Sequence, residues 1–568
     1  MGFKLAVLML TLFIVVFSAI SILLAGHLFL SWDDGESLQD YKCPDCNVIL
    51  ISIDTLRADH LGCYGYHRDT SPSIDRLASE GILFENAFSN SHWTLPSHMS
   101  MMTSQYPSVH DVNLHYRYDQ RLDESKTTLA EVLKSNGYAT AAFTGGGQVA
   151  PEFGFGQGFD EYNTIDTLYG NTELLDGIFD WLDKNHDRRF FMFVHTYSAH
   201  SPYIPPEPFR GMFDDNYSGN IIDSPEKMNK ACIGDCNIHG LFASSINTSD
   251  PQDVYHAIAL YDEGIRYTDY CIGELLERLD SLDLSRETAI IFTSDHGEDL
   301  TEHGIIAEHH DVYDEQTHVP LIIRLPGGDS KRAESLVQSI DITPTILDIL
   351  DIPPTPGMQG EDLIPMPETD KNAFIERGYF YFFAYYNVIA SYTKNTSLCS
   401  TIPEEIGRDL CLGQFNISVC SSLQGRFKDV CNRLNQLHKT GNYTHGLYAS
   451  LILNGILNNR TASETAEEVR KEALKYPEPF HDAAIRNEEF KYIYRHDDQD
   501  ELYDLIQDPW EQDNIIDERP GISEGLRTEL LRWHEENKRF KAMEYSGQSE
   551  VYIDQETLEQ LKALGYLN

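Results

Sequence analysis

Four residues of the types that bind metals or move protons stand at the end of short apolar runs or just beyond them. They are Asp54, His200, Asp295 and His296. The runs cover residues 48–53, 190–194 and 289–293. Short, nearly continuous apolar runs are typical of buried strands in a parallel sheet. Because the active site of such a sheet lies beyond the carboxyl ends of its strands, we expect these four side chains to converge at one edge.

The segments between the runs have the apolar spacing of helices. Residues 128–134 form one such pattern, which stops at the helix-ending pair Asn136-Gly137. Residues 265–279 form another, just before the run that leads to Asp295. This alternation predicts an α/β fold, a three-layer α/β/α sandwich with a mostly parallel central sheet. Strand patterns at 490–494 and 501–505, followed by a helical pattern, predict a small antiparallel C-terminal subdomain.

Residues 93–98, Trp-Thr-Leu-Pro-Ser-His, resemble the active-site motif of the sulfatases, a family of the alkaline phosphatase superfamily. Residues 52–65 and 294–298 are similar to the two metal-binding segments of that family. Other family landmarks recur at residues 137–141, 156–160, 261–269, 341–345, 501–509 and 561–566. In sulfatases a Cys or Ser two residues before the Pro is oxidised to formylglycine. Here Thr94 holds that position, and its extra methyl group prevents formation of the aldehyde.

The resemblance implies one divalent metal ion and a catalytic set. The implied metal ligands are Asp54, Thr94, Asp295 and His296. An oxygen-rich set with one imidazole suits Ca²⁺ or Mn²⁺ and could take Zn²⁺ or Mg²⁺. The implied catalytic residues are Thr94, His98, His200 and His310, with His309 as the alternative to His310. Thr94 would be the metal-bound nucleophile, and a histidine would protonate the leaving oxygen.

Two positions depart from the sulfatase pattern. His98 stands where sulfatases usually have Arg, and Gly145–Gly147 stand where they carry Lys-x-His. The chain therefore lacks two cations that hold sulfate in relatives. The glycines could bring backbone N–H groups close to an anion, or could simply form a loop.

These residues favour a metal-dependent hydrolase of sulfate or phosphate esters, with a sulfated or phosphorylated small molecule, glycan or lipid as substrate. A sulfate ester on Thr94 needs water to attack sulfur, whereas a phosphate ester could also pass to an alcohol. A phosphodiesterase, or a transferase of the phosphoglycerol or phosphoethanolamine type, is therefore one alternative. An inactive glycan-binding pseudoenzyme is the other, because the Arg and Lys-x-His positions are lost.

The composition excludes one class of partner. The formal net charge of −47 argues against nucleic acid, because phosphates would be repelled. A highly solvated acidic surface is the simpler interpretation, and dense binding of divalent cations is the other.

Residues 5–30 form an apolar run that is long enough to cross a bilayer. Lys4 precedes the run and Asp33, Asp34 and Glu36 follow it, so the positive-inside rule places the N-terminus in the cytoplasm. We expect a transmembrane anchor with the catalytic domain outside the cytoplasmic membrane. A cleaved signal peptide is the alternative.

Ten cysteines and six Asn-x-Ser/Thr sequons fit an exported protein. Disulfides are expected within three groups: Cys43 and Cys46; Cys232 and Cys236; and Cys399, Cys411, Cys420 and Cys431. Cys63 and Cys271 are expected to be buried thiols. The expected division of the chain is an anchor (1–31), a stalk (32–46), a catalytic domain (47–368), a Cys-rich insertion (369–472) and a C-terminal subdomain (473–568).

Overall fold

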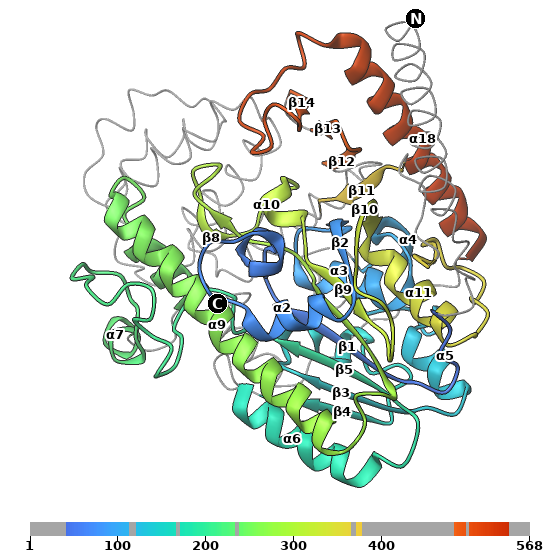
Figure 1. Ribbon diagram of the computed structural model, residues 1–568. Helices are drawn as coiled ribbons and strands as arrows, with labels where there is room; N and C mark the ends of the chain where they lie inside the picture. Colours follow the sequence, from blue (N-terminus) through green and yellow to red (C-terminus); the bar gives the residue numbers. More distant parts are fainter. Residues whose placement is uncertain are drawn as a thin grey trace, which may run out of the picture. The chain divides into compact units, whose positions relative to one another are not determined.

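An eight-stranded sheet forms the centre of the fold (Figure 1). The computed structural model describes residues 41–112, 121–165, 171–232, 238–364, 371–377, 482–495 and 499–544. The strands follow the spatial order β10-β2-β9-β6-β1-β5-β3-β4. Their bounds are β1 (Asn47–Ile53), β2 (Ile82–Phe88), β3 (Ala139–Thr144), β4 (Glu161–Thr164), β5 (Phe190–Thr196), β6 (Thr288–Ser294), β9 (Leu321–Arg324) and β10 (Lys331–Gln338). Only β9 pairs antiparallel to its neighbours within this sheet, so the predicted mostly parallel sheet is confirmed.

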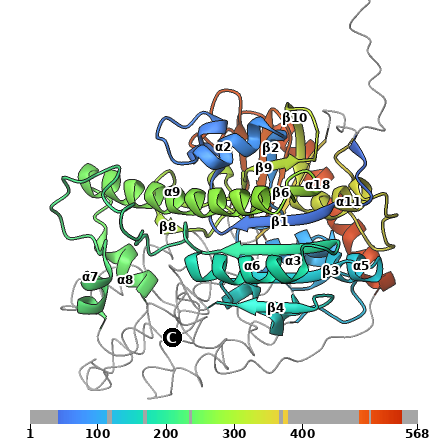
Figure 2. The same cartoon turned by 60° about the horizontal axis from the view of Figure 1, so that its bottom comes forward.

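The three central strands are buried at every position, as expected for strands that are covered on both faces. Ile49 and Ile51 of β1 join the large apolar cluster beneath helix α9 (Pro251–Ser281). Helices α2 (Pro72–Ser79) and α6 (Asn171–Asn185) contact α9 on this face, and Figures 1 and 2 show α9 lying along the sheet.

Helix α3 (Thr94–Thr103) covers the opposite face. Its His98 bonds the Ser52 side chain and touches the Phe193 ring, and both of these alternate with residues of the α9 face. Helices α5 (Leu129–Ser135) and α11 (Ile342–Ile349) pack against α3. The sheet therefore lies between two helical layers.

A second, antiparallel sheet follows the order β11-β12-β13-β14 and confirms the expected C-terminal sheet. Its strands are β11 (Ala373–Glu376), β12 (Ala483–Arg486), β13 (Phe490–Tyr494) and β14 (Glu501–Asp504), and helix α18 (Pro520–Glu544) packs on β12 and β13. Strand β11 falls within the range 369–472 assigned to the insertion. Apart from residues 371–377, that range lies outside the described residues, and the domain division stays a prediction.

Buried ion pairs join the C-terminal sheet to residues His309–Thr317, which we call the strap. Lys491 of β13 is fully buried, and its ammonium lies 2.7 Å from Asp314 and 3.1 Å from Glu511. Arg495 holds Asp311 at the other end of the strap. The strap in turn accepts backbone hydrogen bonds from Gly297 and Glu298, next to His296. The C-terminal sheet thus supports one wall of the predicted site.

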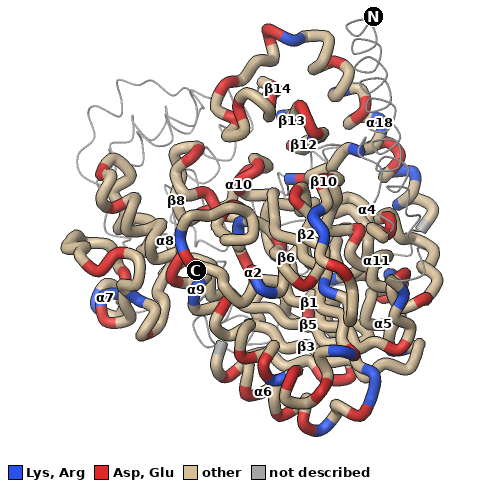
Figure 3. The backbone as a smooth tube through the Cα atoms, in the orientation of Figure 1, with Lys and Arg blue, Asp and Glu red and all other residues tan. Residues whose placement is uncertain are grey.

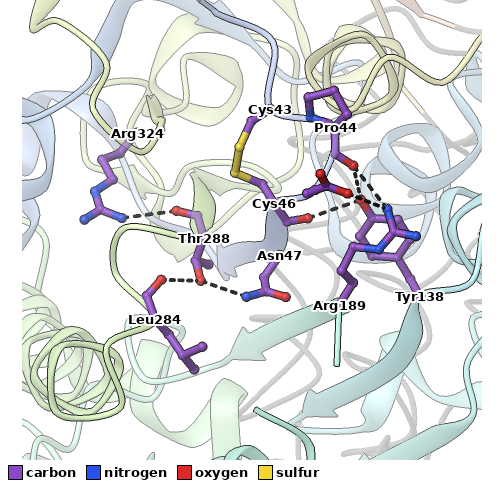
Figure 4. Close-up of a disulfide and its surroundings, with 10 residues drawn as sticks. Cys43, Pro44, Cys46, Asn47, Tyr138, Arg189, Leu284, Thr288 and Arg324 are labelled. Carbon is purple, nitrogen blue, oxygen red and sulfur yellow. Dashed lines mark hydrogen bonds and ion pairs between the residues drawn. A yellow bond between two sulfur atoms is a disulfide. The ribbon is translucent and has the colours of Figure 1, made fainter. Parts of the chain in front are cut away.

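Cys43 and Cys46 form a disulfide immediately before β1, which confirms the disulfide expected for this pair (Figure 4). The Arg189 guanidinium lies over the Tyr138 ring and donates to the Pro44 carbonyl at 3.3 Å. Cys232 is disulfide-bonded as well. Cys271 is a buried thiol as expected, and the thiol Cys63 is half-buried.

Acidic residues are spread over helices and loops along the described chain (Figure 3). This distribution fits a solvated acidic surface. The apolar run at residues 5–30 lies outside the described residues, and within the described ranges no helix is long and apolar enough to cross a bilayer.

The Lys491 ion pair predicts a large stability effect. Lys491→Met leaves the buried Glu511 carboxyl without a cation and leaves Asp314 paired with Arg486 alone, so the free energy of unfolding should fall by about 3–5 kcal/mol in urea titrations. Lys538→Met is the matched control, because its pair with Glu535 is exposed and screened by solvent and should contribute little to stability. Equal losses of stability from the two substitutions would contradict the conclusion that Lys491 is the cation of a buried ion pair.

His303 predicts a pH dependence of stability. Burial opposes its charge, but the hydrogen bond to Glu315 at 2.7 Å outweighs burial and raises the pKa to about 9. Because the folded pKa exceeds the unfolded value of about 6.5, this stabilisation is complete below pH ~6.5 and is lost as the pH rises through 9. Thermal unfolding from pH 6 to pH 10 should therefore show a smaller decline for His303→Gln than for the unsubstituted protein.

Candidate active site

The carboxyl ends of three adjacent parallel strands carry the predicted residues. Strand β1 lies between β5 and β6, with Ile53 opposite both Thr196 and Ser294. Asp54 and Asp295 directly follow β1 and β6, and helix α3 begins at Thr94. The predicted convergence at one sheet edge is therefore found.

Thr94 sits between a carboxylate and an imidazole. Its Oγ1 donates to Asp54 Oδ2 at 3.1 Å and lies 3.4 Å from His296 Nε2. The side chain is fully buried, at the first residue of α3. The Leu95 N–H of the same helical turn donates to the Gln148 side chain at 3.1 Å. The position of the hydroxyl is thus set by both its helix and its partners.

The tautomer of His296 indicates a cation site. Its Nδ1–H donates to the Gly297 carbonyl at 2.8 Å, which leaves a lone pair on Nε2. That lone pair lies 3.4 Å from Asp295 Oδ2 and 3.8 Å from Asp54 Oδ1. Neither carboxylate oxygen accepts a hydrogen bond within the described part of the chain, although both are buried. Three electron-rich atoms without a donor between them fit a metal ion.

Asp295 is oriented toward this position by the backbone. Its Oδ1 accepts from the N–H groups of His296 at 2.9 Å and Thr55 at 3.3 Å, so Oδ2 faces the other ligands. The ligand atoms of Asp54, Asp295 and His296 lie within 4.8 Å of one another. Together with Thr94 they give the oxygen-rich set with one nitrogen that the sequence analysis expects.

His98 is a neutral support and does not replace the charge of the arginine. Its Nδ1–H donates to the Thr94 carbonyl at 2.9 Å, and its Nε2 accepts from the Ser52 hydroxyl at 2.9 Å. Burial lowers its pKa to about 3, even though Asp295 lies nearby. Both ring nitrogens are engaged by the protein, so His98 fixes the start of α3 without contacting the Thr94 hydroxyl.

His195 belongs to the site, and the sequence analysis does not select it. Its Nε2 lies 3.6 Å from Asp54 Oδ2, and its ring is 4.7 Å from that of His98. Burial lowers its pKa to about 4. The sequence signal that could have identified His195 is its position as a polar residue at the end of a central apolar strand. In the sheet it lies beside Ser52 in register.

His200 and His309 lie beyond the candidate ligand atoms, on what we call the substrate side. The His309 ring is 4.3 Å from His296 and 5.6 Å from His200. His310 instead lies 2.7 Å from the Glu308 carboxylate. The assignment of His310 is therefore corrected to its neighbour His309, because only the His309 ring faces the metal ligands.

The substrate-side histidines are held in neutral forms. Burial lowers the pKa of His200 to about 4 and that of His309 well below its ordinary value. The Nδ1 of His200 donates to the Ser201 carbonyl, and the Nδ1 of His309 lies 3.3 Å from Glu298. An anionic ester placed beside these rings would favour the protonated imidazole and so raise both pKa values.

The Gly145–Gly147 loop is shaped by Tyr197. A Cβ on Gly145 would lie 2.5 Å from the Tyr197 ring, and Gly146 and Gly147 both have positive φ. The Gly146 N–H donates to Thr144 and the Gln148 N–H to Tyr197. These backbone donors are occupied by the protein, so the loop interpretation is favoured over an anion cradle.

The family model described as sulfatase matches residues 46–352, which is more than half of the chain. The chain belongs to the sulfatase family. This family of hydrolases accounts for the order of the motifs and for the sheet edge on which they meet.

Curated relatives of this sulfatase-family protein include human iduronate 2-sulfatase, 28% identical over 56% of this chain and 66% of the human protein. The ulvan-active sulfatase of Formosa agariphila is 26% identical over 58% of this chain and 67% of its own. The chain thus spans about two thirds of the length of these relatives.

Solved structures share the fold. The phosphonate monoester hydrolase of Agrobacterium radiobacter superposes with a TM-score of 0.57 and 20% identity, over 88% of this chain and 96% of that one. A protein solved with its substrate D-glucosamine-2-N,6-O-disulfate gives a TM-score of 0.61 and 17% identity, over 87% and 98% of the two chains.

Removal of one charge from the crowded carboxylates should stabilise the metal-free protein and abolish its stabilisation by metal. Asp54→Asn should raise the melting temperature of the chelator-treated protein, because it relieves repulsion near Asp295. The same change should abolish the stabilisation by Mn²⁺ or Ca²⁺, which at 100 times Kd amounts to about 2.7 kcal/mol. Calorimetry of both proteins with chelator and with each metal measures both effects. Asp348→Asn, which is remote from the site, should change neither.

Proposed function

We propose that this protein is a metal-dependent hydrolase of sulfate or phosphate esters, with Thr94 as its nucleophile. The observation that carries the proposal is the His296 lone pair, which faces two unpartnered carboxylate oxygens and the Thr94 hydroxyl. The proposed substrate is a sulfated or phosphorylated glycan, lipid or small molecule. The names of the iduronate and ulvan relatives support a glycan.

Asp54, Asp295, His296 and Thr94 would hold the ion. A bound divalent cation would favour ionisation of the Thr94 hydroxyl and neutralise the ester oxygens during in-line attack. Asp54 Oδ2 accepts the hydroxyl hydrogen of Thr94 and so fixes the orientation of the attacking oxygen. His98 holds the carbonyl of the same residue, which limits rotation of the nucleophile.

The leaving oxygen needs a proton, and His200 and His309 are placed to give it. Nδ1 of His200 is held by the Ser201 carbonyl and Nδ1 of His309 lies by the Glu298 carboxylate, so both rings have a fixed orientation beside the proposed ligands. Because both are neutral in the empty pocket, proton donation requires that the bound anion first raise the pKa of one of them. The covalent ester on Thr94 is then attacked by water, since no formylglycine is available for elimination.

We also propose that the catalytic domain lies outside the cytoplasmic membrane, anchored by residues 5–30. The Cys43–Cys46 disulfide supports an oxidising compartment. The apolar length of residues 5–30 and the flanking charges support the anchor.

Substitution of Thr94 tests the nucleophile. Thr94→Ala should lower kcat/KM at least ~10³-fold, whereas Thr94→Ser, which keeps a hydroxyl, should stay within about 10-fold. Initial rates on aryl sulfates, phosphate monoesters and phosphate diesters, with each metal, measure this. Thr103→Ala is the control, because its hydroxyl bonds only the Met99 carbonyl of the same helix.

Equal activity of Thr94→Ala and the unsubstituted protein would refute the assignment of Thr94 as the nucleophile. Product analysis by mass spectrometry separates the alternatives. A phosphoryl group that leaves Thr94 for glycerol or ethanolamine would indicate a transferase. Metal binding and glycan binding with no turnover of any ester would indicate the pseudoenzyme.

A further inference from the structure

His239 lies outside every family motif, on helix α8 (Ile238–Ser245), yet it joins two segments of the site. Its Nδ1 bonds the Ser201 hydroxyl, and its Nε2 lies 3.1 Å from Glu308 Oε1. Ser201 directly follows His200, and Glu308 directly precedes His309. One imidazole therefore bridges the two segments that carry the substrate-side histidines.

One end of the bridge continues to the His200 ring, and the other continues to His310, the residue next to His309. The carbonyl of Ser201 accepts the Nδ1–H of His200, so the residue that His239 holds also orients that ring. On the other side, the second oxygen of Glu308 pairs with His310 at 2.7 Å, so its carboxylate lies between two imidazoles. Movement at either end would change the distance between the His200 and His309 rings, now 5.6 Å.

The bridge is charge-assisted and stands at the outer end of a row of rings. Centroids are separated by 4.3 Å from His296 to His309, 5.6 Å from there to His200, and 5.7 Å from His200 to His239. The His239 side chain is 12% exposed and Glu308 is 26% exposed, whereas His296 is fully buried. Burial opposes the charge on His239, but Glu308 outweighs it and raises the pKa.

We propose that His239 is a positioning residue that sets the separation of His200 and His309 and thereby the placement of the ester between them. This inference rests on the proposed function. Both ring nitrogens of His239 are occupied by protein partners, so it acts through its neighbours and does not contact the substrate. Displacement of catalytic groups by ~1 Å can cost about 100-fold in rate, which gives the bridge a measurable effect.

The test compares His239→Phe with His239→Gln. Phe fills the space but removes both bonds, so kcat/KM should fall ~10- to 100-fold. Gln offers one acceptor for Ser201 and one donor for Glu308, so it should restore activity to within about 3-fold. Mn²⁺ affinity by calorimetry should be unchanged in both variants, because His239 touches no proposed ligand.

His256→Phe is the matched control. His256 is a nearly buried histidine that lies 3.0 Å from Asp214 and stacks on Tyr217, without contact to the site. Its activity should equal that of the unsubstituted protein. Loss of activity equal to that of His239→Phe, failure of Gln to restore activity, loss of metal affinity, or full activity of His239→Phe would each overturn the proposal.

Crystal structures of both variants give a readout that does not need turnover. The separation of the His200 and His309 rings should widen or become variable in the Phe variant and stay near 5.6 Å in the Gln variant. If the unsubstituted protein hydrolyses no ester, the proposed function fails while this distance still tests the bridge. An unchanged distance in the Phe variant would refute the bridge even if Thr94 is the nucleophile.

Discussion

The site depends on one electrostatic constraint. Two fully buried aspartates point oxygens without hydrogen-bond donors toward the lone pair of His296. Burial of unpaired charge is costly enough that proteins either protonate such groups or give them a cation. The backbone bonds that fix Asp295 and the partner that fixes His296 hold the atoms in place all the same. The fold therefore holds an excess of negative charge at this position, which a divalent cation would neutralise.

Around these two carboxylates, neutral groups occupy the positions at which sulfatases usually carry fixed cations. His98 takes the Arg position with both nitrogens engaged, and the Gly145–Gly147 loop makes room for Tyr197. The attraction for an anionic ester would then come mainly from the ion itself and from imidazoles that become charged on binding. We expect such a site to be less selective for sulfate esters than a site with a permanent guanidinium and ammonium beside the nucleophile.

The parallel sheet and its active edge could be predicted because strands covered on both faces must be apolar throughout, and Asp54 and Asp295 interrupt that pattern. The resemblance supplied Thr94 and the order of the ligands. Sequence did not separate His309 from His310, because adjacent residues differ only in which way the chain turns after β8 (Ile306–Glu308). His195 and His239 were missed because their roles arise from register and from a contact between distant segments. The ion pairs of the strap have no local signal either.

Strands β11 and β12 pair directly although residues 378–481 separate them in the sequence. The ends of this separation meet at Arg377 and Asp482, which share a backbone hydrogen bond of 2.9 Å and an ion pair of 2.7 Å. The sheet thus brings Arg377 and Asp482 together at one point, whatever the length of the sequence between them. Because the entropy of loop closure grows only with the logarithm of length, this point can accept segments of very different size. We therefore expect the pairing of β11 with β12 to keep its register when the sequence between Arg377 and Asp482 is lengthened or shortened.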